Sequence, residues 1–225
     1  MDFGTPQFWL AGLEIIVINI LLSGDNAVVI ALACRNLPPH QRRWGVFWGA
    51  VGAIVLRIIL TFFAVSLLQL PYLKIIGSVL LLWIGVKLLL PEDGGGDVHA
   101  DGSFWNAVKT IIIADLVMSI DNVLGVAAAA RGSLLLLIFG LVVSVPLVIG
   151  GAQIIMRLIE RYPILIVAGG GLLGFVAGEL VIDDSAIAEW VHAHAAWLEC
   201  AAPIVGIALV VAPAKWLEAR RSHAH

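Results

Sequence analysis

Two short motifs place carboxylate and amide side chains inside segments that are otherwise almost entirely apolar. One motif, SGDNA, contains Asp25–Asn26, and the other, SIDNV, contains Asp121–Asn122. Asp115 and Arg57 also lie within long apolar runs. A charged side chain at the centre of a bilayer costs at least about 2.5–3.5 kcal/mol on insertion scales, and such residues commonly mark ion or substrate pathways. These residues are therefore candidates for function, and the alternative is a structural ion pair in which Arg57 neutralises one aspartate.

Helical spacing arranges the polar residues around each pair in the same way. At about 100° per residue, positions i, i+4 and i+7 fall on one stripe of a helix. One stripe holds Asn19, Ser23 and Asn26, and its counterpart holds Asp115, Ser119 and Asn122. In an unbroken helix Asp25 and Asp121 lie about 120° away from these stripes. Each aspartate therefore either faces a different neighbouring helix or joins the stripe through local unwinding, which Gly24 favours in the first segment.

The donor atoms in these segments are carboxylate, amide, hydroxyl and carbonyl oxygens. No His or Cys lies near the aspartates, which disfavours zinc and copper(I) and favours Mg²⁺, Ca²⁺ or Mn²⁺. The side chains of Asp25, Asp115, Asp121 and Arg57 carry a formal charge of −2. One divalent cation would balance this charge, and protonation of an aspartate would balance it almost as well. The pattern predicts a cation that is handled as a substrate, with no cofactor bound.

Other polar residues give weaker signals. Glu179 lies near the end of an apolar segment and could form an acidic route with Asp183 and Asp184. His192 and His194 form an H-x-H pattern in a polar loop, for which a solvated loop is a more common explanation than a metal site. The role of both histidines stays open from the sequence.

Composition and run length predict an all-α, polytopic transmembrane helix bundle. The chain of 225 residues is 61% hydrophobic and 13% charged, whereas soluble domains are roughly half apolar and about a quarter charged. A spanning helix needs about 20 mainly apolar residues, and seven such segments follow one another. They cover residues 8–34, 45–69, 72–90, 104–130, 134–157, 163–182 and 200–218. A short interfacial helix is expected around Trp190–Trp197.

Internal similarity predicts two inverted three-helix repeats plus one extra helix. Asp121 follows Asp25 by 96 positions, and Asp115 follows Asn19 by the same offset. A second block, LPYLKIIGSVLLLWIGVKLL, resembles YPILIVAGGGLLGFVAGELV at an offset of 92. Because each repeat has three spans, the second enters the bilayer from the opposite face, and transporters built in this way hold their substrate near the midplane.

The repeats and the composition of the connecting segments divide the chain into four parts. The first three-helix repeat covers 1–91, and a Gly- and Asp-rich cytoplasmic linker covers 92–103. The second, inverted repeat covers 104–182. An outer loop, the seventh helix and a cytoplasmic tail are expected at 183–225.

The distribution of Lys and Arg predicts the orientation. In the seven-span arrangement ten of these residues fall on one side and two, Lys74 and Arg131, on the other. Because cytoplasmic loops collect positive charge, the N-terminus is expected outside and the C-terminus in the cytoplasm. No basic patch or aromatic platform suggests a nucleic-acid partner, so the expected surroundings are a lipid bilayer.

These motifs resemble the TerC family of integral membrane proteins, in particular its YjbE-like branch. The resemblance rests on VINILLSGDNAVVIALA, DLVMSIDNVLGVAAAARG, GGGLLGFVAGELVIDD and the mid-span Arg57. It implies manganese homeostasis, mainly efflux, and a location in a bacterial inner membrane. The ion-site residues that it implies are Asp25, Asn26, Asp115, Asp121 and Asn122. Many members carry an acidic residue where this chain has Asn19, so this chain would have one carboxylate fewer.

The leading expectation is a transporter, not an enzyme, that exports a divalent metal cation by alternating access of the two repeats. Mn²⁺ is the favoured substrate. Two other classes stay open. Two aspartates at mid-bilayer could share a proton, as in an intramembrane aspartic protease. The chain could also be a non-transporting protein that delivers metal or scaffolds a membrane complex. The expected partners are the metal ion and lipid, and a homodimer is compatible with the pattern.

Overall fold

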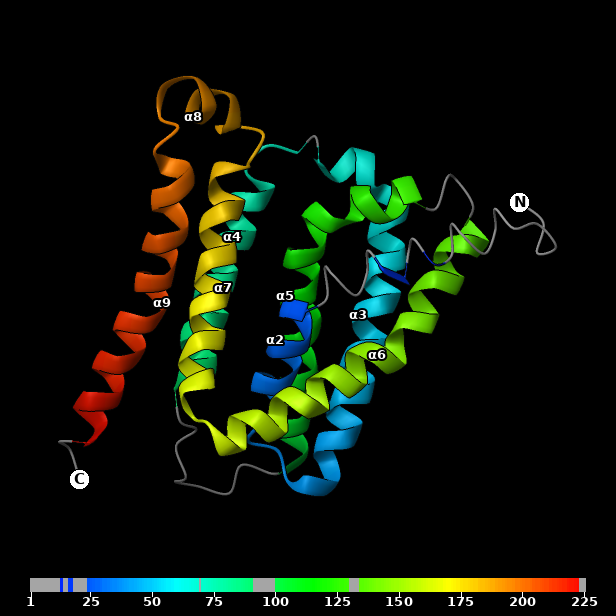
Figure 1. The fold of residues 1–225 in the computed structure, drawn as a ribbon, viewed down its shortest axis with the longest axis vertical. Coiled ribbons are helices and arrows are strands. Elements are labelled where there is room, and N and C mark those ends of the chain that lie inside the picture. Colours follow the sequence, from blue (N-terminus) through cyan, green and yellow to red (C-terminus); the bar gives the residue numbers. More distant parts are fainter. Residues whose placement is uncertain are drawn as a thin grey trace. The chain divides into compact units, whose positions relative to one another are not determined.

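The protein is helical throughout the part of the chain that the structure describes. The computed structural model describes residues 13, 16, 17, 24–68, 70–90, 100–129 and 134–222, and these residues contain no β-strand (Figure 1). Their helices are α2 (Gly24–Cys34), α3 (Pro39–Leu68), α4 (Leu73–Leu89), α5 (Ala100–Ala129), α6 (Leu134–Arg161), α7 (Ile164–Ile182), α8 (Ala188–His194) and α9 (Leu198–Ser222). The predicted all-α class is confirmed for these residues.

Five described helices contain stretches that are long and apolar enough to cross a membrane. These stretches are Pro39–Phe63, Ser103–Ile120, Leu137–Arg161, Ile164–Ile182 and Leu198–Arg220. They match the predicted second, fourth, fifth, sixth and seventh spans. The third predicted span corresponds to α4, whose 17 residues reach the lower limit for crossing the hydrocarbon core. The first predicted span is described mainly over α2, so seven spans stay a prediction.

The chain divides into two compact units that interleave along the sequence. Unit 1 comprises Met1–Leu68 and Ser103–Met156, and unit 2 comprises Gln69–Gly102 and Arg157–His225. Unit 1 therefore holds α2, α3, α5 and most of α6, and unit 2 holds α4, α7, α8 and α9. Both Asp-Asn motifs belong to helices of unit 1.

Glycines on α3 allow α5 to approach closely within unit 1. A Cβ atom added at Gly49 would lie 2.5 Å from Cδ1 of Ile111, and one added at Gly52 would lie 2.6 Å from Cδ1 of Ile112. Both distances are well below van der Waals contact, so the glycines leave room for the isoleucine side chains. Small residues at helix contacts are the usual way in which membrane helices pack closely, because van der Waals contact drives their association.

The packing of α7 against α9 brings two backbones together in unit 2. A Cβ atom added at Gly174 would lie 2.3 Å from the backbone oxygen of Gly206, and one added at Gly178 would lie 2.3 Å from that of Ala202. Gly174 and Gly178 are four residues apart and share one face of α7, as in other small-xxx-small contacts. α4 runs along α7 in the same unit (Figure 1).

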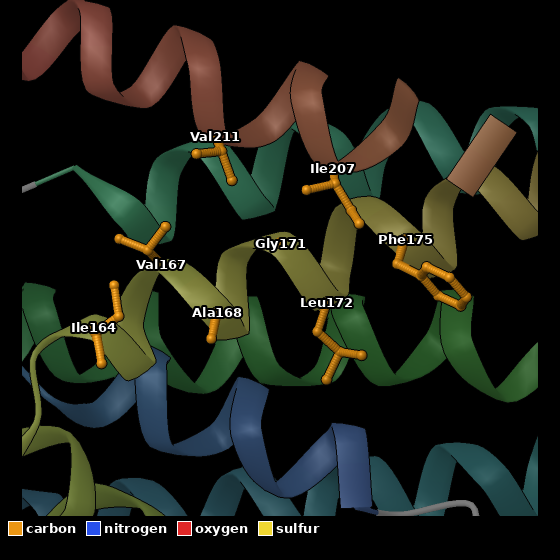
Figure 2. A pocket seen from close by; sticks show the side chains of 8 residues that line it. All are labelled: Ile164, Val167, Ala168, Gly171, Leu172, Phe175, Ile207 and Val211. Atoms are coloured by element: carbon orange, nitrogen blue, oxygen red, sulfur yellow. The ribbon is translucent and has the colours of Figure 1, made fainter. Parts of the chain in front are cut away.

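An apolar groove of about 530 Å³ lies along α7 and α9 (Figure 2). Its lining consists of Ile164, Val167, Ala168, Gly171, Leu172, Phe175, Ile207 and Val211. None of these side chains carries a charge or a hydrogen-bonding group. The groove is therefore suited to hydrocarbon and unsuited to a cation.

Candidate functional site

A buried ion pair joins α3 to α5 in unit 1. Nη2 of Arg57 donates a hydrogen bond to Oδ1 of Asp115 over 2.7 Å. Arg57 is 3% exposed and Asp115 is 5% exposed, so both charges are enclosed by protein. Charge-assisted bonds of this length are among the strong ones, and removing either partner would leave an uncompensated buried charge. The structure thus identifies Asp115 as an aspartate that Arg57 neutralises.

Ser119 forms hydrogen bonds to both members of this pair, so the three residues make one cluster. The Ser119 hydroxyl donates to Oδ2 of Asp115 at 3.1 Å and accepts from Nε of Arg57 at 3.1 Å. Ser119 is fully buried. The two oxygens of Asp115 therefore face different donors, a guanidinium nitrogen and a hydroxyl. We refer to Arg57, Asp115 and Ser119 as the Arg57 cluster.

The local sequence explains why these three side chains meet. Asp115 and Ser119 are four residues apart on α5, so they lie on the same face of the helix. Ile111 lies one turn before Asp115 and occupies the space that Gly49 leaves on α3. Arg57 follows Gly49 by about two helical turns. α3 and α5 therefore approach each other about two turns before the position from which the Arg57 side chain extends to α5.

α2 contributes a second aspartate to the surroundings of the cluster. Asn26 is buried, and Asp25 is half-buried. The backbone N–H of Asn26 donates to Oδ1 of Asp25 at 2.7 Å. The charges of Arg57 and Asp115 both act on the Asp25 carboxyl group. The Coulomb energy of Asp25 therefore depends on the Arg57 cluster, and a change in the charge of that cluster would be felt on α2.

The structure describes the other predicted site residues only in part. Asn122 is half-buried on α5, three residues after Ser119. Asp121 also belongs to α5, but its side chain lies outside the described part of the structure. Asn19 and Ser23 lie outside the described residues. Their roles, and the distance between the two motif aspartates, stay predictions.

Within the described part of the chain, no group of three or more His, Cys, Asp or Glu side chains is arranged to hold a metal ion. The described carboxylates of unit 1 near the cluster are those of Asp25 and Asp115. A hard cation accepted there would also need neutral oxygen ligands, which amide, hydroxyl and carbonyl groups supply. Asn26 and Ser119 provide such groups on α2 and α5.

Asp184 has a place that sequence reasoning missed. It is fully buried, and its carboxylate accepts hydrogen bonds from the backbone N–H groups of Tyr72, Lys74, Ile75 and Ala186 at 2.9–3.2 Å. Burial by itself would raise the pKa of the Asp184 carboxyl, but these four donors outweigh that effect and hold the pKa below its ordinary value. Asp184 therefore caps the start of α4 from the end of α7, in place of the acidic route that we expected for it.

A weak signal for this cap was present in the sequence. Helices usually begin after a Ser, Thr, Asp or Asn whose side chain accepts from the first turn. α4 instead follows Leu-Pro-Tyr, and Tyr72 at its start makes no side-chain cap and has a φ of 66°. A helix that lacks its own cap needs an acceptor from elsewhere, but the sequence does not say which residue supplies it.

The remaining polar residues lie at the surface of unit 2. Glu179 and Asp183 are exposed. Nδ1 of His192 lies 2.8 Å from Oε1 of Glu199, and both side chains are exposed. The ring of His194 stacks on Trp190 with a centroid separation of 5.9 Å. A short helix is present here as α8, Ala188–His194, which overlaps the expected helix around Trp190–Trp197 and contains both histidines; its position at a membrane interface stays a prediction.

Comparison with known proteins adds the family. Residues 4–222 match the family described as Integral membrane protein TerC family. The chain belongs to the TerC family. This TerC family member is 41% identical over 205 residues to "Uncharacterized membrane protein YjbE" of Bacillus subtilis (strain 168), which covers 91% of this chain and 94% of the relative. No solved structure matches the chain.

More distant relatives also share most of their length with this TerC protein. "Uncharacterized membrane protein YceF" of Bacillus subtilis (strain 168) is 28% identical over 182 residues, covering 76% of this chain and 70% of the relative. "UPF0053 inner membrane protein YgdQ" of Escherichia coli (strain K12) is 24% identical over 197 residues, covering 80% and 83%. TerC membership confirms the resemblance drawn from the motifs and the integral membrane class, with which the five apolar helices agree.

Proposed function

We propose that this TerC family protein exports a divalent metal cation, with Mn²⁺ as the first candidate substrate. The Arg57 cluster carries the proposal, because it holds a carboxylate and a guanidinium in the interior of a membrane helix bundle, within electrostatic range of the aspartate of α2. Burying an ion pair is expensive, and well-packed apolar side chains would join two helices at least as well. Charges kept inside a membrane protein commonly serve an ion pathway.

The ligands of the proposed site are oxygen atoms from α2, α5 and the segment before α2. Oxygen donors without His or Cys suit Mg²⁺, Ca²⁺ and Mn²⁺, and the family resemblance selects Mn²⁺ among them. Carboxylates come from Asp25, Asp115 and Asp121, amide oxygens from Asn19, Asn26 and Asn122, and hydroxyls from Ser23 and Ser119. Arg57 is the charge partner of these ligands, and Glu179 is a supporting residue for the route by which the ion would reach the outer side.

Two inverted three-helix repeats would supply the moving parts. The motif helices α2 and α5 share unit 1 with the helices that follow them, and the matching helices α4 and α7 share unit 2. In transporters built from inverted repeats, the substrate site lies near the bilayer midplane where helices of the two repeats meet. Unit 1, which carries the ligands, would open to each side in turn. Seven spans, an outer N-terminus and a cytoplasmic C-terminus in an inner membrane complete the proposal.

Flux into proteoliposomes that contain only this chain tests the proposal. We expect uptake of Mn²⁺ above that of protein-free vesicles, with Ca²⁺, Mg²⁺ and Zn²⁺ measured in parallel. Asp25→Asn should reduce the flux at least about tenfold, the effect of about 1.4 kcal/mol of lost ion stabilisation. Glu189→Gln is the matched control, because Glu189 is an exposed carboxylate outside the apolar spans, and it should transport like the wild type.

Two results would contradict the proposed function. If none of the four ions is transported, the transport role is refuted and a protein that delivers metal or scaffolds a complex is favoured. Full flux by Asp25→Asn would remove the midplane aspartate from the pathway. In cells, loss of the gene should raise the manganese content and the sensitivity to added manganese, and an unchanged content would count against Mn²⁺ as the substrate.

A further inference from the structure

We propose that Arg57 is a tethered cation that takes the place of the metal ion when the site is empty and must release Asp115 before the ion binds. This inference rests on the proposed function and extends it to the regulation of the same site. Its first support is position. The guanidinium already occupies lone pairs of a buried carboxylate, which are the atoms that a hard divalent ion would need.

The geometry of the Arg57 cluster suits release. Among the described contacts, Arg57 makes one direct bond to Asp115, whereas two parallel bonds are the arrangement that makes arginine–carboxylate pairs strongest. It places Nη2 on Oδ1 of Asp115 and Nε on the hydroxyl of Ser119. A cation that takes over Oδ1 therefore replaces one direct charge-assisted bond, while the Nε contact to Ser119 can hold the guanidinium nearby.

Charge explains why a tethered cation is useful here. A carboxylate left alone in the membrane interior is strongly unfavourable, so an empty site without Arg57 would have to bind a proton or another ion. With Arg57 in place, Asp115 is neutralised in the empty state. The empty transporter then has one uncompensated carboxylate fewer, and the formal charge of −2 that remains on Asp25 and Asp121 can be balanced by protons instead of a returning metal ion. Arg57 would in this way favour net export over one-for-one exchange of metal across the membrane.

Substitution of Arg57 separates net transport from exchange. Arg57→Met keeps much of the length of the side chain and removes the charge. The variant should bind Mn²⁺ at least about tenfold more tightly, because Asp115 can give both oxygens to the ion and a like charge is gone. Exchange of labelled Mn²⁺ between Mn²⁺-loaded vesicles and the medium should continue at half the wild-type rate or more. Net uptake into metal-free vesicles should fall at least about tenfold.

A second variant and a stability measurement guard against misfolding. Arg57→Lys keeps the charge but, as a compact ammonium, cannot reproduce both Nη2 and Nε contacts, so it should show both changes in weaker form. Saturating Mn²⁺ should raise the melting temperature of Arg57→Met more than that of the wild type, because the ion replaces the missing cation. This measurement works for protein purified with Mn²⁺ even when the ion-free variant is unstable.

The outcomes distinguish this inference from the proposed function. Wild-type protein that neither binds nor moves any of the four ions would overturn both. Wild-type flux together with Mn²⁺ affinity in Arg57→Met that is equal to or weaker than wild type would overturn only the tethered cation and leave Arg57 as a structural strut. Equal losses of exchange and net uptake would have the same meaning.

Discussion

The capping of α4 by Asp184 leads to a prediction about stability. Asp184 accepts four backbone hydrogen bonds, three of them from Tyr72, Lys74 and Ile75 at the start of α4. The carboxylate lies at the end of α7, so it links α7 to the start of α4, where Lys74 lies 110 positions earlier in the chain. Replacing Asp184 by Ala leaves these donors without their acceptor, and replacing it by Asn leaves one neutral acceptor oxygen.

The size of the effect follows from the number of bonds. Hydrogen bonds to charged groups contribute about 1.5–3 kcal/mol each, which puts an upper bound of roughly 6–12 kcal/mol on four bonds. Donors at a helix end recover part of this from water, and the loss of a single helix cap costs about 0.5–2 kcal/mol. We therefore expect Asp184→Ala to lower the free energy of unfolding by about 3–5 kcal/mol and Asp184→Asn by about 1–3 kcal/mol.

Thermal unfolding in detergent, followed by tryptophan fluorescence at a fixed heating rate, measures this loss. A shift of about 2–4 °C per kcal/mol is usual for chains of this size, so Asp184→Ala should lower the apparent melting temperature by roughly 6–20 °C. Hydrogen exchange should also accelerate at the amides of residues 72–75. Asp183→Asn, at the neighbouring exposed aspartate, should change neither measurement.

The dependence on pH has a defined sign. Because the folded protein holds the pKa of Asp184 below the unfolded value of about 3.9, its stabilisation is fully present above that value. It is lost as the pH falls through the lower, folded pKa. The difference in melting temperature between wild type and Asp184→Asn should therefore be constant near neutral pH and shrink below about pH 4. A wild-type melting temperature in Asp184→Ala, with unchanged exchange at residues 72–75, would refute the capping role.

Three further predictions concern helix packing and orientation. Gly174→Ala should destabilise the protein by about 1–3 kcal/mol, because its Cβ would meet a backbone oxygen at 2.3 Å. Gly171→Ala, whose Cβ would have its nearest contact at 3.6 Å, should be neutral or stabilising. Melting temperatures of the two variants test both expectations. Gly49→Ala should lower both stability and Mn²⁺ flux, because the added Cβ would push α3 away from α5. Adding Ile111→Val to the same chain should restore part of both, since it removes the Cδ1 atom that would lie 2.5 Å from that Cβ. The exposed thiol of Cys200 should react with a membrane-impermeant maleimide added from outside, and labelling only from the cytoplasmic side would reverse the proposed orientation.

The sequence by itself determined the kind of molecule. Long apolar runs can exist in lipid only as structures that satisfy their own backbone hydrogen bonds, so each run predicts a helix with little dependence on its neighbours. This is why the spans that contain α3, α5, α6, α7 and α9 were predictable within a few residues. The cost of charge in hydrocarbon likewise identified Arg57 and the aspartates as partners of one another.

The tertiary structure decided which of these residues meet. α3 and α5 are apolar on most of their surface, so their sequences do not say which face is turned toward a neighbour. Contact depends instead on where small residues let two backbones approach, as Gly49 does opposite Ile111, and this places Arg57 against Asp115 and Ser119. The cap of α4 has the same origin. Hydropathy reports how favourably a segment enters lipid, whereas the partner of a buried charge is set by the shapes of two surfaces that only folding brings together.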